Sequence, residues 1–153
     1  MTFFDDFAAA LQTYPADSVT LKITDVSVET GTSGSVNVNE IWKFKVKVEN
    51  NGNINMANVI LHVSGENNAT LSTAGKNGPF KAGLQEFGSL TVNAGGSQKS
   101  DFLYFKAPSK DQPTADLVSA HIFDWDADLA PLLENNAGHS TGASDTYPAQ
   151  VFP

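Results

Sequence analysis

Alternation of apolar and charged residues over residues 40–63 is the strongest pattern in the chain. Four apolar residues, Trp42, Phe44, Val46 and Val48, are separated by lysines and followed by Glu49, which predicts a strand with one apolar and one charged face. The next residues, Asn50-Asn51-Gly52-Asn53, tolerate the positive φ angles of a tight turn. A second alternating run then places Val59, Leu61 and Val63 on one face. We predict a hairpin whose apolar face is covered by a second layer.

Period-two patterning continues on both sides of this predicted hairpin. Val19, Leu21 and Ile23 share one face, whereas Val26 and Val28 have the other parity, so we expect a β-bulge near Thr24-Asp25. A short edge piece at 36–38 and strands near Leu71 and at 87–92, 101–106, 115–123 and 147–152 complete the series. Residues 124–136 are interpreted as a long connection, and Pro148 favours an edge position for the last strand. The predicted fold is all-β, an immunoglobulin-like antiparallel β-sandwich of about seven strands.

The first residues have a helical pattern instead. Thr2 is a suitable N-cap, and Pro15 is a suitable end. The apolar positions recur at helical spacing, with Phe4 beside them: Phe3, Phe7, Leu11 and Tyr14. We therefore divide the chain into a short N-terminal helical segment, residues 1–15, and a sandwich domain, residues 16–153. The helix either closes one end of the domain or docks on a partner.

Composition narrows the possible functions. The chain has 153 residues, 41% of them hydrophobic, which suits a single folded domain. Its net charge of −8 argues against nucleic acid as a partner. It has no cysteine, no segment typical of a signal peptide and no apolar run long enough to span a membrane. We therefore expect no membrane role and a protein made in the cytosol, or the mature or excised form of an exported one.

Candidate chemistry is sparse. Asp124, Asp126 and Asp128 alternate, with Glu134 downstream, and carboxylates so spaced can bind Ca²⁺. The EF-hand pattern fails, because Leu129 and Asn135 stand where glycine and glutamate are needed. We expect no cofactor and no high-affinity Ca²⁺ site; a looser loop site or a solvated acidic turn remain as alternatives.

Other chemistry-bearing residues have two interpretations each. Trp125 is either a sugar-stacking platform or a cover for the end of the core. Asn68-Ala69-Thr70 is either an N-glycosylation acceptor or a chance tripeptide in a loop. His62 and His121 lie on predicted strands, where we expect them to face solvent or a loop. With no Gly-x-Ser-x-Gly elbow and no phosphate-binding glycine loop, we predict that the chain is not an enzyme.

Several turn and core motifs resemble those of CARDB-like immunoglobulin-fold modules. The resemblance covers about residues 19–136 and rests on three segments. The first is 41–53 together with 57–63, and the second is 87–90 together with 94–96 and the strand that ends at Ala107-Pro108. The third is 120–124 together with Glu134-Asn135-Asn136. It implies an immunoglobulin-like fold and a binding or spacer role in surface, adhesion or structural proteins. The N-terminal helical segment and the tail after Asn136 are extra to the resemblance.

We therefore expect a non-catalytic structural or interaction module. The preferred setting is the surface of a larger protein assembly such as a phage virion, by analogy with decoration proteins of similar fold. Partners would be other subunits or copies of the chain itself. The alternative is an extracellular adhesion or carbohydrate- or protein-binding module from a secreted or cell-surface protein. Apolar residues near the two ends of the chain are the predicted interface: Phe3, Phe4, Phe7, Leu11, Tyr147, Val151 and Phe152.

Overall fold

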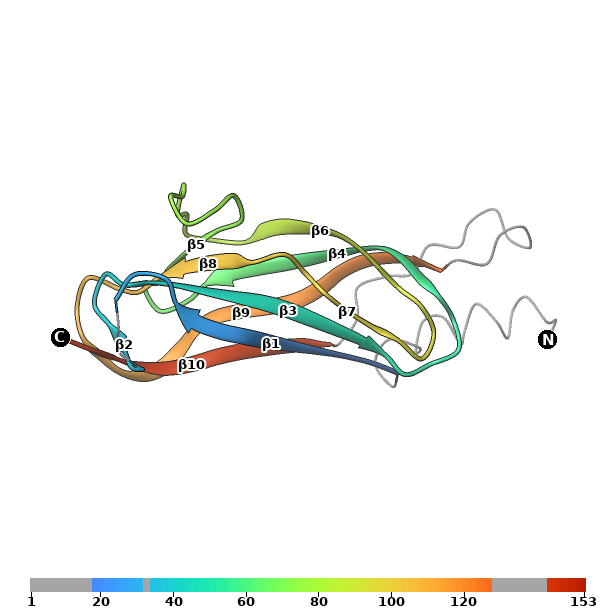
Figure 1. Cartoon of the computed structure of the whole chain (residues 1–153), viewed down its shortest axis with the longest axis horizontal. Coiled ribbons are helices and arrows are strands. Elements are labelled where there is room, and N and C mark those ends of the chain that lie inside the picture. The colour runs from blue at the N-terminus through green and yellow to red at the C-terminus, as the bar shows by residue number, and fades with distance from the viewer. Residues whose placement is uncertain (1–17, 32–33, 128–142) are drawn as a thin grey trace.

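The computed structural model describes residues 18–31, 34–127 and 143–153, and these residues form two β-sheets (Figure 1). Sheet A has the spatial order β1-β3-β8-β5, with β7 also paired to β3. Its strands are β1 (Val19–Val28), β3 (Ile41–Asn50), β5 (Thr70–Ser72), β7 (Ser97–Lys99) and β8 (Leu103–Lys106). All of its pairings are antiparallel.

Sheet B contains the other five described strands in the spatial order β2-β10-β9-β4-β6. They are β2 (Val36–Asn37), β4 (Met56–Gly65), β6 (Gln85–Val92), β9 (Gln112–Ala127) and β10 (Ser144–Phe152). β2 pairs parallel to β10, and the other pairings are antiparallel. The predicted all-β class with two sheets is confirmed, with ten strands in the described residues where about seven were expected.

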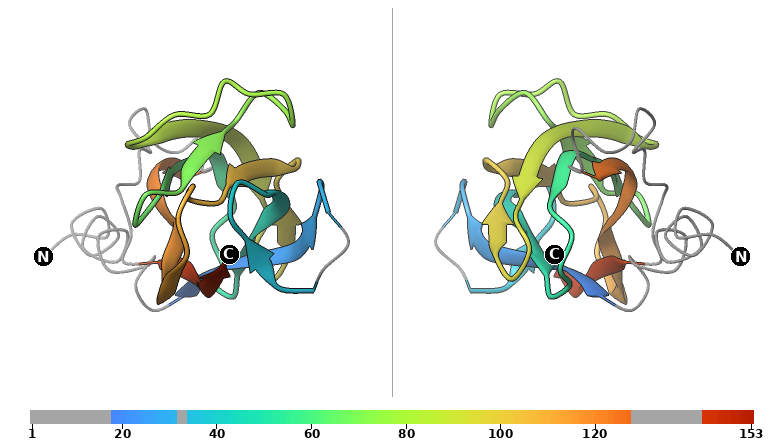
Figure 2. Two further views of the ribbon diagram at one scale, coloured as in Figure 1. Left: turned by 90° about the vertical axis from the view of Figure 1, so that its left-hand side faces the viewer. Right: turned by 90° about the vertical axis from the view of Figure 1, so that its right-hand side faces the viewer.

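The core lies between the two sheets, which Figure 2 shows end on as two layers. Every apolar residue that the alternation assigned to the buried face is buried: Trp42, Phe44, Val46 and Val48 from β3, and Val59, Leu61 and Val63 from β4. Phe44 and Trp42 also pack against Phe105 of β8, with ring centroids 6.1 Å and 6.3 Å away. The predicted core register is therefore correct.

The predicted hairpin is wrong. β3 pairs with β1, β7 and β8, whereas β4 pairs with β6 and β9, so the two strands belong to different sheets. Residues 51–55 carry the chain from one layer to the other. Both strands still bury their alternating apolar faces, because the faces meet across the core instead of lying side by side.

Asn50, the last residue of β3, anchors this crossing. Its buried side-chain amide donates hydrogen bonds to the carbonyl oxygens of Ile54 (2.7 Å) and Val92 (3.1 Å). Its Oδ1 accepts a hydrogen bond from the Gly52 amide at 3.1 Å. One side chain thus ties the 51–55 connection to the end of β6.

The edges of the sheets behave largely as the sequence indicates. The β1 register shifts between Thr24 and Ser27, and Asp25 has φ of 55°, which confirms the predicted bulge. Pro148 lies at a register shift of β10. It is on an edge there, because β2 pairs with β10 only further along the strand.

The amide of Ile23 in β1 donates to Asp145 Oδ2 of β10 at 2.8 Å, so a side chain joins the two sheets along one side.

Two sequence predictions need correction or lie outside the description. The stretch after Asp124 does not begin a connection, because β9 continues to Ala127. The predicted N-terminal helix, with Phe3, Phe4, Phe7 and Leu11, lies outside the described residues, as does Asp128.

Candidate functional site

Six lysines lie on the outward surface of sheet A, which we call the lysine face. They are Lys22, Lys43, Lys45, Lys47, Lys99 and Lys106. Strand register aligns Lys22, Lys47 and Lys99 directly opposite one another across β1, β3 and β7. Like charges placed opposite one another in a sheet are destabilising, so this row opposes folding. A surface that departs from a local folding rule in this way is a candidate for binding.

An aromatic ring lies among these cations. Phe102, just before β8, is 37% exposed. Lys43 Nζ and Lys45 Nζ lie 4.8 Å and 4.6 Å from its ring centroid, within cation–π range. The ring therefore helps to hold the two ammonium groups in place while keeping an exposed apolar surface.

Three carboxylates neutralise part of the lysine face. Asp25 and Glu49 each lie 2.9 Å from a lysine Nζ, of Lys99 and Lys47 respectively. These lysine hydrogen bonds hold the pKa values of Asp25 and Glu49 below their usual range. Glu29 lies 3.6 Å from Lys43. Six lysines against three carboxylates leave a surplus of positive charge.

The outward surface of sheet B carries a cluster of rings instead. His62 of β4 and His121 of β9 are directly opposite in register, with centroids 5.3 Å apart. Phe123 stacks on His62 at 4.0 Å with planes 8° apart, and is itself 41% exposed. Glu86 Oε1 of β6 lies 3.6 Å from His62 Nε2. Both histidines are half-buried against neighbouring rings, so the expectation that they face solvent or a loop was incomplete.

Burial lowers the pKa of His121 from its ordinary value, and the neighbouring His62 lowers it further. Desolvation disfavours the charged imidazolium, and a second imidazolium nearby would add repulsion. The His121 ring is therefore held in its neutral form at neutral pH. The cluster therefore presents the exposed ring of Phe123 near a neutral His121.

Five carboxylates on the same strands or directly after them form what we call the acidic face: Glu66, Glu86, Asp116, Asp124 and Asp126. The strands of sheet B contain no lysine. Ser64 and Ser119 hydroxyls donate to Glu66 Oε1 at 2.6 Å and 3.0 Å, which fixes that carboxylate over the sheet. The two outer faces of the molecule thus carry opposite charge.

The aspartates proposed for Ca²⁺ have other partners. Asp124 Oδ1 accepts a hydrogen bond from the amide of Trp125, and Asp126 Oδ2 accepts one from Asn58 Nδ2, both at 2.9 Å. Within residues 18–31, 34–127 and 143–153, no three acidic or histidine side chains form a group that could hold a metal ion. Weak or absent Ca²⁺ binding stays a prediction, since Asp128 lies outside these ranges.

Trp125 is not a surface platform, because its side chain is only 1% exposed. Ile122 and Trp125 both face the core although they are three residues apart. The reason is a bulge: Leu61 pairs with Ile122 and Ile60 with Asp124, so Phe123 is an extra residue that shifts the parity. Phe123 faces outward, as alternation from the buried Ile122 predicts, and the bulge reverses the direction of the residues that follow it.

The predicted C-terminal interface residues differ in their surroundings. Tyr147 is half-buried with its ring centroid 6.0 Å from that of Phe105, and burial raises the pKa of its hydroxyl. Val151 is buried, whereas Phe152 is 39% exposed. Of these three, Phe152 offers the most surface to a partner, and the interface role stays a prediction.

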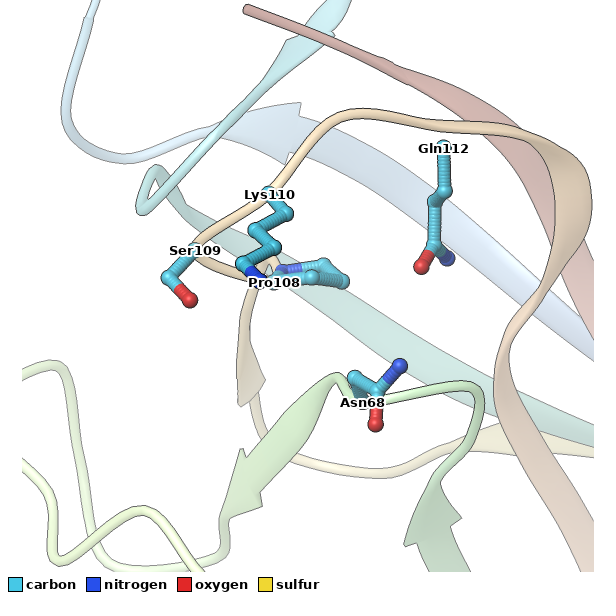
Figure 3. A pocket seen from close by; sticks show the side chains of 5 residues that line it. All are labelled: Asn68, Pro108, Ser109, Lys110 and Gln112. Atoms are coloured by element: carbon cyan, nitrogen blue, oxygen red, sulfur yellow. The ribbon is translucent and has the colours of Figure 1, made fainter.

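A shallow polar hollow of about 340 Å³ lies between the turn after β4 and the β8–β9 connection (Figure 3). Its lining consists of Asn68, Pro108, Ser109, Lys110 and Gln112. Gln112 Nε2 donates to the Asn67 carbonyl at 3.1 Å, which ties the two sides of the hollow together. Asn68, in the glycosylation tripeptide, is exposed and has φ of 71°.

No family model and no curated protein matches the chain. Solved structures similar to it include a structural genomics target named SoR45 (9% identity, TM-score 0.47, covering 91% of this chain and 89% of that one). Spo0M, a sporulation control protein from Bacillus subtilis, gives 17% identity and TM-score 0.41, with 89% of this chain and 50% of that one covered. A putative late embryogenesis abundant protein gives 14% identity and TM-score 0.41, with 97% and 79% covered. All three TM-scores lie below 0.5, so these likenesses assign no function to this chain.

In the described residues, no helix has the length and apolar character needed to cross a membrane.

Proposed function

We propose that this chain is a non-catalytic interaction module with an immunoglobulin-like, CARDB-like sandwich, and that it serves as a surface or decoration subunit of a larger protein assembly such as a phage virion. The observation that carries the proposal is the segregation of charge between the lysine face of sheet A and the acidic face of sheet B. Both faces are supported by a shared core, so they are presented on a rigid scaffold.

Broad faces of this kind suit contact between proteins. Complementary potentials steer encounter and fix orientation more than they add affinity. Each face also carries one exposed phenylalanine, Phe102 or Phe123, and aromatic residues are enriched at the centres of interfaces. The combination of an aromatic centre with a charged surround is typical of a protein-binding surface.

Density-gradient fractionation of the native source, followed with an antibody to the chain, tests the proposal. We expect the chain to sediment with particles far heavier than its own 16.3 kDa, and to be released by high salt because the contacts are charged. If the chain is found only at the top of the gradient, where free small proteins sediment, the proposal is contradicted.

The polar hollow supports a second candidate, a carbohydrate-binding adhesion module. Its amide, hydroxyl and ammonium groups are donors and acceptors suited to sugar hydroxyls. Calorimetric titration with glycans tests this candidate. Binding that is lost in Gln112→Ala and retained in Gln98→Ala, an exposed glutamine on β7, would support it, whereas equal losses would reject the hollow as the site.

A further inference from the structure

Opposite charge on the two outer faces suggests a partner that the chain itself can supply. We propose that the lysine face of one copy binds the acidic face of a second copy, so that copies stack head to tail. The inference rests on the proposed function and names its partner. It depends on charge complementarity, on the aromatic residues of each face and on the directions in which the faces point.

Charge complementarity is the first argument. The lysine face has six lysines and three carboxylates, whereas the acidic face has five carboxylates and no lysine on any strand of its sheet. An exposed ion pair contributes little on its own, so binding requires several pairs acting together. A face whose cations are aligned in a row across three strands can supply several pairs at once.

Exposed phenylalanines are the second argument. Phe102 lies beneath two lysines on one face, and Phe123 lies beside Asp124 on the other. They are two of the four large hydrophobic residues that are exposed in the described part of the chain. Stacking the lysine face of one copy on the acidic face of another would bury an exposed phenylalanine on each side of the contact. The charges around these rings would disfavour other relative orientations of the two copies.

The directions of the faces decide the type of assembly. The lysine face and the acidic face belong to different sheets, and each lies on the side of its sheet away from the shared core. A contact between unlike faces is heterologous, and it leaves one lysine face and one acidic face free at the ends. Further copies can therefore add, in contrast to a closed two-fold dimer.

Light scattering and sedimentation velocity on the purified chain test the inference directly. In about 50 mM NaCl we expect the average mass to rise above 16.3 kDa as the protein concentration increases. In about 500 mM NaCl it should return to the monomer value, because the Debye length falls below about 10 Å. A monomer at both salt concentrations up to roughly millimolar protein would overturn the inference.

Charge reversal identifies the faces. Lys22→Glu/Lys45→Glu leaves the lysine face with four lysines and five carboxylates, and Glu86→Lys/Asp124→Lys leaves the acidic face with three carboxylates and two lysines. Each variant should remain monomeric alone, because one of its two faces has lost its complementary charge. An equimolar mixture should associate in pairs, because the unchanged acidic face of the first variant then meets the unchanged lysine face of the second. The two variants have net charges of −12 and −4, since each change shifts the charge by two from −8, so net attraction cannot explain recovery. A mixture that stays monomeric would overturn the inference.

Two controls complete the test. Lys110→Glu changes the charge as much as Lys22→Glu but lies in the β8–β9 connection, so only Lys22→Glu should weaken association. Equal weakening by Lys110→Glu and Lys22→Glu would overturn the assignment of the lysine face.

If circular dichroism shows that Glu86→Lys/Asp124→Lys is unfolded, Glu86→Lys/Asp116→Lys replaces it, because Asp116 is exposed. A chain that is monomeric when pure yet sediments with particles in its source would reject self-stacking and leave the proposed function standing.

Discussion

Replacing Asn50 by alanine should be among the most destabilising single changes to a polar residue of this protein. The side chain is wholly buried, donates to two carbonyl oxygens and accepts from one amide. Alanine leaves the Ile54 and Val92 carbonyls without these donors. An intramolecular hydrogen bond contributes about 0.5–1.5 kcal/mol, and a buried group left without a partner costs about 1–3 kcal/mol. We therefore expect the free energy of unfolding to fall by about 2–4 kcal/mol.

Urea denaturation followed by circular dichroism measures this change, with an unchanged slope indicating that the unfolded state is comparable. A loss of 3 kcal/mol corresponds to a fall in Tm of about 6–12 °C for a chain of this size. Asn51→Ala is the matched control, because Asn51 is exposed and should change stability by less than about 0.5 kcal/mol.

Asn50→Asp separates the donors from the shape of the side chain. It keeps an acceptor for Gly52 but removes both amide donors and places a carboxylate against two carbonyl oxygens. It should be less stable than Asn50→Ala at pH 7, and the difference should shrink at low pH as the carboxylate takes up a proton. If Asn50→Ala is as stable as Asn51→Ala, the crossing between the sheets does not depend on this side chain, and the reasoning fails.

Four further predictions concern other parts of the molecule. Phe44→Ala should lower the free energy of unfolding by about 3–5 kcal/mol in urea denaturation, because it leaves a cavity in a fully buried position. The pKa of His121 is lower in the folded state than in the unfolded state, so its stabilising contribution is present above the unfolded value and is lost as the pH falls towards the folded one. The free energy of unfolding should therefore decrease from pH 7 to pH 5, and His121→Gln should flatten this decrease; an identical slope in both proteins would contradict it. Calorimetry should show Ca²⁺ binding weaker than a Kd of about 10⁻⁶ M, since Asp124 and Asp126 already accept hydrogen bonds. Deletion of residues 1–14 should leave Tm unchanged and weaken partner binding, and unfolding of the truncated protein would place that segment in the core instead.

Alternation predicted which residues are buried but not which sheet each strand joins. Trp42 and Leu61 face the core as expected, because period-two patterning reports the face of a strand directly. The partner of a strand is set by contacts far away in sequence. The same apolar pattern in β3 and β4 therefore suits a hairpin and a crossing between layers equally well.

The candidate site was visible in the sequence only in part. Lys43, Lys45 and Lys47 alternate, and that signal identified a charged face. Strand register then adds Lys22 and Lys99 from β1 and β7, which no local pattern links to β3. Of the two interpretations of Trp125, the core position is correct and the surface platform is wrong. Alternation could not choose between them, because one extra residue in β9 reverses the direction of Trp125 and a bulge of this kind leaves no turn residue in the sequence to mark it.

The hydrogen bond from the Ile23 amide to Asp145 affects how the molecule opens. β1 is an edge strand of sheet A, and β10 lies near the edge of sheet B, so separate sheets would fray independently. A carboxylate of one sheet that holds an amide of the other makes the two edges open together. In native-state hydrogen exchange, the central amides of β1 and β10 should therefore exchange as one cooperative unit, and Asp145→Ala should separate them into two.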